Sequence, residues 1–313
     1  MRKSSQTNSY PGIISKLGKL FSIEDGLRDL DDVLTFLWRL FNLPGKEQTA
    51  GSSHLDHTGN CGIDHPEIIR RRFVSVTIVC ILAIPIIWWF GTPSSKDSAH
   101  TFLEWLGLRF SGLITALVIP LLLTMVLFLG PLSLHYIDGV FRLYLEPRYW
   151  VTSCKNYIWL RNHVAAPISE EFIFRACMLP LLVPHFGEGW SIFIAPLFFG
   201  VAHLHHLIEK ITQNNEEVAD AIKSSVFQMA FTSLFGAYSA FLFLRTGHLV
   251  APVLVHAFCN HMGFPAFNEV LALEDTTLRR RVIAAFVVGL LAWMYLLFPL
   301  TSPFLYSNEI YHC

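Results

Sequence analysis

The chain has 313 residues and a formal net charge of −1, with 53% hydrophobic and 15% charged residues. Soluble domains usually carry about a quarter charged residues, so this composition indicates a membrane protein. The near-neutral charge and the scattered Lys and Arg residues give no reason to expect a nucleic-acid partner. The six cysteines include no CxxC pair, so the sequence suggests neither a disulfide framework nor a zinc ribbon.

Residues 1–64 are polar and mixed in composition. Apolar residues recur at helical spacing between Leu27 and Leu37, which is typical of an amphipathic surface helix. No apolar run there is long enough to span a bilayer, and no signal peptide is visible. We therefore expect a polar N-terminal segment at residues 1–64 that is cytosolic or poorly defined, a membrane domain at residues 65–306 and a short C-terminal tail at residues 307–313.

Seven apolar stretches follow, and a hydrocarbon core needs about 20 apolar residues to cross. The stretches without any charge are 73–90, 110–129, 224–244 and 282–300. The stretches that include polar residues are 164–184, 189–204 and 248–267. Because an open sheet cannot satisfy its backbone in lipid, we predict an all-α polytopic membrane bundle of seven or eight spans.

The distribution of Lys and Arg residues tests this span count, since they accumulate on the cytoplasmic side. With seven spans, one set of loops holds Arg70, Arg71, Arg72, Arg142, Arg148, Lys155, Arg161, Lys210, Lys223, Arg279, Arg280 and Arg281. The opposite loops hold only Lys96, Arg109 and Arg245. The asymmetry predicts that the first set faces the cytosol.

Two adjacent acids and an arginine lie inside the predicted span 164–184. Glu171 and Arg175 are four residues apart, so they share a helix face, with the acid before the base. Glu170 points about 100° away and is not the natural partner of Arg175. Mutual charge neutralisation accounts for Glu171 and Arg175 as structural residues. It leaves Glu170 unexplained, and a buried carboxylate without a partner suits a general base.

The other polar residues at membrane depth are His203, His256 and Asn260. His203 ends the predicted span 189–204. His256 and Asn260 are four residues apart and stack on one helix face. Both can donate hydrogen bonds, and a pair of fixed donors is what an oxyanion needs. Taken singly, His256 would be an ordinary interhelical hydrogen-bonding residue.

Three motifs in this order resemble those of the CaaX prenyl endopeptidase family, most closely its eukaryotic branch, the Ras-converting enzymes. They are Glu170-Glu171-x-x-x-Arg175, Phe199-x-x-x-His203 and His256-x-x-x-Asn260. The surrounding segments EEFIFRACMLP, FFGVAHLHH, FGAYSAFLFLRTGHL and HAFCNHMGFP support the resemblance. It covers roughly residues 64–306 and is densest over 159–265. Eukaryotic members usually carry apolar spans ahead of Asp64, and residues 1–64 have none.

The resemblance implies an intramembrane peptidase that removes the aaX tripeptide from farnesylated or geranylgeranylated CaaX proteins, such as Ras-like small GTPases. It implies a catalytic cavity within the endoplasmic reticulum membrane, open to the cytosol, and no metal or cofactor. Carried onto this chain, Glu170 and His203 would hold and deprotonate the attacking water. His256 and Asn260 would stabilise the tetrahedral oxyanion, and Glu171 and Arg175 would support the site.

Three other mechanisms remain open from the residues alone. Glu170, His203 and His256 could ligate zinc, although no HExxH motif occurs. Cys177 or Cys259 could act as a nucleophile, although apolar packing is the simpler role for both. A transporter or scaffold could use the buried acids to relay protons, although no internal duplication is visible.

Overall fold

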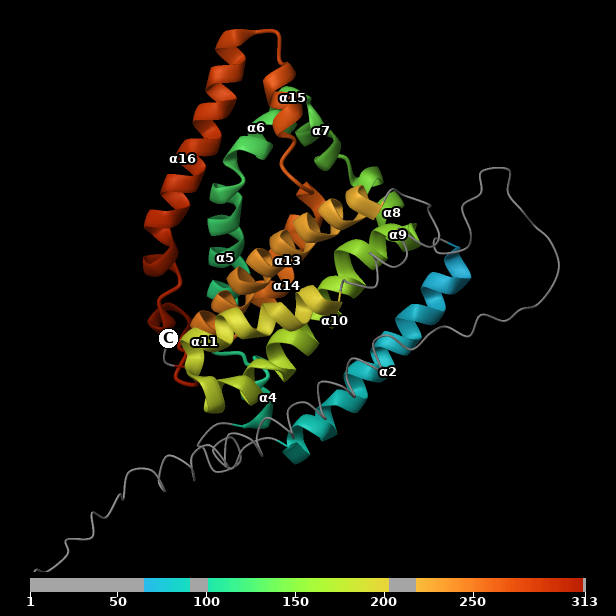
Figure 1. Cartoon of the computed structure of the whole chain (residues 1–313), viewed down its shortest axis with the longest axis vertical. Coiled ribbons are helices and arrows are strands. Elements are labelled where there is room, and N and C mark those ends of the chain that lie inside the picture. Colours follow the sequence, from blue (N-terminus) through green and yellow to red (C-terminus); the bar gives the residue numbers. More distant parts are fainter. Residues whose placement is uncertain (1–64, 91–100, 203–217, 312–313) are drawn as a thin grey trace, which may run out of the picture. The chain divides into compact units, whose positions relative to one another are not determined.

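The computed structural model describes residues 65–90, 101–202 and 218–311, all within the compact unit Glu47–Cys313. Every regular element in these ranges is a helix, which confirms the all-α prediction (Figure 1). The surface helix expected near Leu27 and the site residue His203 lie outside the described residues.

The described helices follow one another with short connections. In chain order they are α2 (Pro66–Phe90), α4 (Phe102–Trp105), α5 (Leu113–Leu127), α6 (Leu129–Ile137), α7 (Val140–Tyr144), α8 (Pro147–Lys155), α9 (Tyr157–Leu160), the π-helix η1 (Arg161–Ala165), α10 (Ala166–Glu171), the π-helix η2 (Phe172–Cys177), α11 (Leu179–Ala202), α13 (Val218–Thr246), α14 (Val250–Met262), α15 (Phe267–Ala272), α16 (Thr276–Leu300) and the 3₁₀-helix η3 (Pro303–Tyr306).

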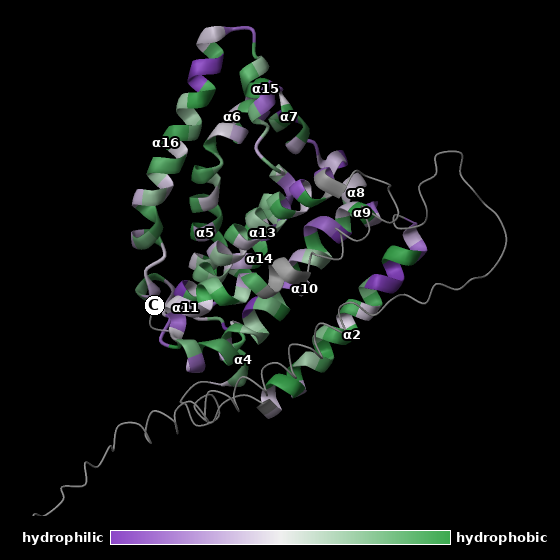
Figure 2. Ribbon diagram, viewed as in Figure 1, coloured by the Kyte–Doolittle hydropathy of each residue, from purple (hydrophilic) through white to green (hydrophobic). Residues whose placement is uncertain are grey.

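Helices α2, α13 and α16 are long and apolar enough to cross a membrane. They contain the predicted spans 73–90, 224–244 and 282–300. Only 17%, 28% and 11% of their most apolar windows, respectively, are buried inside the protein. Figure 2 shows hydrophobic residues along most of α16, with hydrophilic residues near its start. Exposed apolar surface on this scale indicates that lipid covers these helices.

The other predicted spans differ from straight membrane helices. The stretch 110–129 is interrupted, because α5 begins at Leu113 and the chain then bends by 76° between α5 and α6. In the stretch 248–267 the main helix is the 13-residue α14, which ends at Met262 and is followed by Gly263 with φ +67°. Within the described ranges there are three candidate spans, or four if the bent pair counts as one. The predicted count of seven or eight is therefore not confirmed.

The stretches 164–184 and 189–204 also depart from single regular spans. The first is helical almost throughout, but it passes through the two π-helices on either side of α10. In the second, residues 189–202 lie in α11, and the helix break at Gly187, with φ 74°, separates them from the first stretch. Buried polar residues and helix breaks suit these segments to the interior of the bundle better than to a lipid-facing position.

Helix α13 lies at the centre of the packing that positions the site. It packs against α11 and α14, and α14 also contacts α5, α10 and η1 (Figure 1). Helix α16 packs along α5 and α6. The short, polar helix α10 is therefore held between α14, the two π-helices and α2.

The segment after α16 returns to the end of α13 and is tied to it by side chains. The Asn308 amide donates to the main-chain carbonyls of Leu244, at 2.8 Å, and Arg245, at 3.2 Å. The Tyr311 hydroxyl donates to the carbonyl of Trp105 at 2.8 Å. Tyr311 is almost fully buried, so this segment is part of the core.

Gly112 and Gly139 provide a matched test of this packing. Both precede a helix with positive φ, at 77° and 73°. A Cβ at Gly112 would overlap the main chain of Tyr306, whereas a Cβ at Gly139 would meet nothing within 4 Å. We expect Gly139→Ala to cost only the conformational penalty, about 1–2 kcal/mol, and Gly112→Ala about 2–5 kcal/mol. Thermal unfolding of the detergent-solubilised variants measures the difference, and equal shifts would contradict the close approach.

Candidate active site

Glu171 is a fully buried carboxylate whose two oxygens contact side chains from three elements. Its Oε1 lies 2.7 Å from Nδ1 of His256 on α14. Its Oε2 lies 3.0 Å from Nε of Arg175 on η2 and accepts a hydrogen bond from the Ser239 hydroxyl on α13. Burial of a carboxylate is tolerated only with such pairing. The Glu171–Arg175 pair expected from their spacing is present, with Arg175 itself 1% exposed.

The hydrogen bond to Glu171 makes Nδ1 of His256 a donor and fixes the orientation of the ring. A carboxylate accepts, so His256 donates from Nδ1. The Phe235 ring packs edge-on against the imidazole, with ring centroids 4.9 Å apart. The opposite nitrogen, Nε2, lies 3.9 Å from Oε2 of Glu170. That distance is too long for a direct hydrogen bond, and one small ligand atom could bond to both groups.

Glu170 and Glu171 are adjacent in sequence but have different surroundings. The Glu170 side chain is 20% exposed, whereas that of Glu171 is 0% exposed. Among the described residues, the cationic partner found within 4.0 Å of Glu170 is His256. The structure therefore brings Glu170 and His256 together, while Arg175 pairs with Glu171.

Asn260 lies one turn beyond His256 on α14 and is hydrogen-bonded to the main chain of η1. Its Nδ2 donates to the main-chain carbonyl of Asn162 at 2.8 Å. An amide NH₂ has two hydrogens, so a second donor remains. Asn260 is exposed, in contrast to His256, which is 6% exposed. The two donors expected to act together thus share one helix face but differ in burial: His256 is buried and Asn260 is exposed.

The backbone around α10 accounts for the positions of these groups. Pro167 lies in the first turn of α10, directly after Ala166, where proline is well tolerated. The π-helices η1 and η2 flank α10, and such wide turns commonly occur at functional sites. They redirect successive side chains, so that Glu171 and Arg175 face α13 and α14 while Glu170 keeps partial exposure.

Three residues on α13 belong to the site and were not identified from the sequence. They are Phe235, Ser239 and Gly236, whose carbonyl lies 3.4 Å from an Arg175 nitrogen. A Cβ at Gly236 would lie 2.9 Å from Cβ of Pro196 on α11, so glycine allows the two helices to approach closely. Small residues at 236, 239 and 240 are the signal for such an approach.

Metal ligation and thiol chemistry were two of the three alternatives left open by the sequence. Across 65–90, 101–202 and 218–311, no group of three or more His, Cys, Asp or Glu residues is placed to hold a metal ion. His203 lies outside those ranges. Cys177 is 0% exposed, which keeps its thiol away from a substrate, and Cys259 is partly buried on α14.

Comparison with known proteins identifies the family. A family model described as type II CAAX prenyl endopeptidase Rce1-like matches residues 153–262. CAAX prenyl protease 2 of Homo sapiens is 44% identical over 252 residues, which cover 78% of this chain and 75% of that protein. The chain belongs to this family. The Rattus norvegicus and Arabidopsis thaliana proteins of the same name are 38% and 35% identical, over 78% and 80% of this chain and 74% and 83% of their own lengths. No solved structure matches.

The matched segment of this family model contains every proposed site residue. Glu170, Glu171 and Arg175 lie near its start, and His256 and Asn260 lie near its end. The structure brings these two ends together through the Glu171–His256 hydrogen bond. The family segment is thus a spatial unit as well as a stretch of sequence.

The buried pairing predicts how stability responds to charge removal. Glu171→Gln removes the carboxylate that pairs with Arg175, and we expect a loss of about 3–5 kcal/mol in the free energy of unfolding. Adding Arg175→Met removes the buried positive charge as well and should recover most of that loss. Denaturant or thermal unfolding in detergent measures both. If the double variant is as unstable as Glu171→Gln alone, the loss of this ion pair does not cause the loss in free energy of unfolding.

Proposed function

We propose that this chain is an intramembrane endopeptidase that removes the C-terminal aaX tripeptide from farnesylated or geranylgeranylated CaaX proteins, including Ras-like small GTPases. Family membership supports a CAAX prenyl peptidase. The observation that carries the mechanism is the contrast between the two acids. Glu171 is occupied by Arg175, His256 and Ser239, while Glu170 is partly exposed and faces Nε2 of His256.

In this mechanism Glu170 and His203 hold a water molecule, and Glu170 takes its proton. The resulting hydroxide attacks the carbonyl carbon of the prenylated cysteine. When the tetrahedral intermediate collapses, Glu170 returns the proton to the leaving amine of the tripeptide. No metal or cofactor is needed, because the carboxylate supplies the base and then the acid.

His256 and Asn260 stabilise the negative oxygen of the intermediate. His256 already donates from Nδ1 to Glu171, so donation from Nε2 requires the imidazolium form. That charge would balance the site, since two carboxylates then face one guanidinium and one imidazolium. Asn260 contributes the amide hydrogen that Asn162 does not use. Donors fixed in a site of low dielectric act strongly on charge that develops only in the transition state.

The proposed location is the endoplasmic reticulum membrane, with the site open to the cytosol. The support comes from charge and hydropathy together. Arg70–Arg72 and Arg279–Arg281 lie in the first turns of the apolar helices α2 and α16. Clustered basic residues at the ends of spans favour the cytoplasmic side. Substrates tethered by a prenyl group would reach the site from that surface of the bilayer.

Glu170→Gln tests the function and the base at once. Purified wild-type protein should release the tripeptide from a farnesylated CaaX peptide, detected by mass spectrometry. The variant should lose about 10²–10⁴-fold in kcat, as expected when a general base is removed. It should unfold at the wild-type temperature, because the Glu171 pairings remain intact. Glu269→Gln, an exposed acid on α15, is the matched control and should be fully active. Near-normal turnover in Glu170→Gln would exclude this mechanism.

Asn260→Ala separates oxyanion stabilisation from substrate binding. Loss of one oxyanion donor typically lowers kcat by about 10²–10³-fold, and KM should be nearly unchanged because ground-state binding is not affected. Asn260→Asp should be at least as damaging, since a carboxylate repels the developing charge. Steady-state kinetics with the same peptide measure both constants. A raised KM with normal kcat would instead assign Asn260 to the peptide-binding surface.

A further inference from the structure

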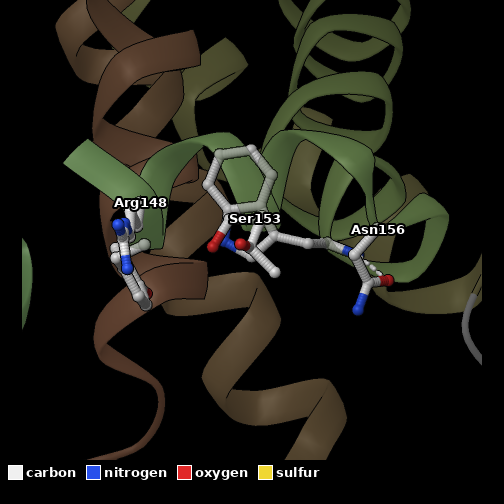
Figure 3. Close-up of a pocket in the computed structure, with 6 residues that line it drawn as sticks. Arg148, Ser153 and Asn156 are labelled. Atoms are coloured by element: carbon white, nitrogen blue, oxygen red, sulfur yellow. Dashed lines mark hydrogen bonds between the residues drawn. The ribbon is translucent and has the colours of Figure 1, made fainter. Parts of the chain in front are cut away.

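A pocket of about 360 Å³ lies on α8 and α9, outside the charged cluster around Glu171. Its lining residues are Arg148, Tyr149, Thr152, Ser153, Asn156 and Trp159. Figure 3 shows Arg148 and Asn156 at opposite sides of the pocket with Ser153 between them. None of these lining residues is acidic.

The lining is rich in hydrogen-bond donors. Arg148 carries a permanent positive charge in a planar fork that matches a carboxylate. Asn156 uses its Oδ1 to accept from the main-chain N–H groups of Ile158 and Trp159, which leaves Nδ2 as its group for a ligand. The indole Nε1 of Trp159 is buried and has no acceptor among the described residues. Because that nitrogen is not accessible, Arg148 and Nδ2 of Asn156 are the donors that an anionic ligand would meet.

A series of ring contacts connects this pocket to the proposed catalytic residues. The Trp159 ring stacks on His163 with centroids 4.7 Å apart, and His163 meets His261 at 5.5 Å. His261 directly follows Asn260, and Asn260 is bonded to the carbonyl of Asn162, next to His163. Helix α8 is itself anchored by a hydrogen bond from the Trp150 indole to the carbonyl of Tyr144. The pocket therefore has a defined position relative to Asn260.

The leaving group is long enough to reach from the region of Asn260 to this pocket. Three extended residues span about 10 Å from the scissile carbonyl to the terminal carboxylate. Ring-to-ring steps of 4.7 and 5.5 Å join Trp159 to His261, so these two rings lie at most about 10 Å apart. Resting on the function proposed above, we propose that this pocket binds the free C-terminal carboxylate of the substrate, with Arg148 as the charged partner. Binding the chain end at this distance would restrict cleavage to the bond three residues from the terminus.

The test compares three farnesylated peptides that differ only at the C-terminus: a free carboxylate, a carboxamide and a one-residue extension. In wild-type protein the carboxamide and the extension should each raise KM on the order of 10-fold, because an exposed charged hydrogen bond is lost. Arg148→Gln should raise KM for the carboxylate peptide by the same factor and leave the other two peptides unchanged. Arg148→Lys should restore part of the discrimination, since it keeps the charge but loses the fork.

Lys155→Gln is the matched control. Lys155 lies on the same helix as Arg148 but does not line the pocket, and its substitution also removes one positive charge. It should discriminate among the peptides as wild type does. Full discrimination in Arg148→Gln, or an equal rise in KM for all three peptides, would overturn the proposal. So would an effect of Arg148→Gln that appears only in phosphatidylserine vesicles and is the same for all peptides, since that result assigns the pocket to a lipid headgroup.

A binding measurement separates this proposal from the proposed function. Fluorescent carboxylate and carboxamide peptides are titrated against Glu170→Gln, with and without Arg148→Gln. A carboxylate preference that depends on Arg148 supports the pocket even if the wild-type protein cleaves neither peptide, in which case the proposed function alone fails. Equal affinities for the two peptides, alongside normal cleavage by wild type, would reject the pocket and retain the function.

Discussion

The buried carboxylate of Glu171 is the constraint on which the rest of the site depends. A carboxylate at 0% exposure is stable only when its oxygens are paired, and its partners come from η2, α13 and α14. Those helices must therefore meet at one point. The carbonyl of Gly236 on α13 lies 3.4 Å from an Arg175 nitrogen on η2, and Phe235 on α13 packs against the His256 ring on α14. Packing and electrostatics thus specify the same arrangement.

Adjacent acids with different surroundings provide a division of roles. Successive residues on a helix point about 100° apart, so two neighbouring glutamates cannot both face the same arginine. Glu171 takes the structural partners, and Glu170 is left with partial exposure opposite Nε2 of His256. A base must be able to exchange a proton with a substrate, so it cannot be fully engaged in permanent ion pairs. Surroundings, rather than residue type, assign the two roles.

Local patterns predicted the features that depend on local geometry. The Glu171–Arg175 pair follows from i,i+4 spacing, and α2, α13 and α16 follow from long apolar runs. Ser239 was missed because its contact with Glu171 joins residues far apart in sequence, and a lone serine in an apolar run carries no signal of its partner. The span count went unconfirmed for a different reason. Hydropathy alone does not distinguish lipid-facing helices from helices that face other protein segments, as α14 shows.

The length of α14 affects which of its site residues are exposed. A helix of 13 residues rises about 20 Å, less than the roughly 30 Å of a hydrocarbon core. Helix α14 alone is therefore too short to cross a bilayer. Asn260, in its last turn, is exposed, while His256, one turn earlier, is 6% exposed. The short helix thus brings one proposed donor to the protein surface while the Glu171 pairings stay buried.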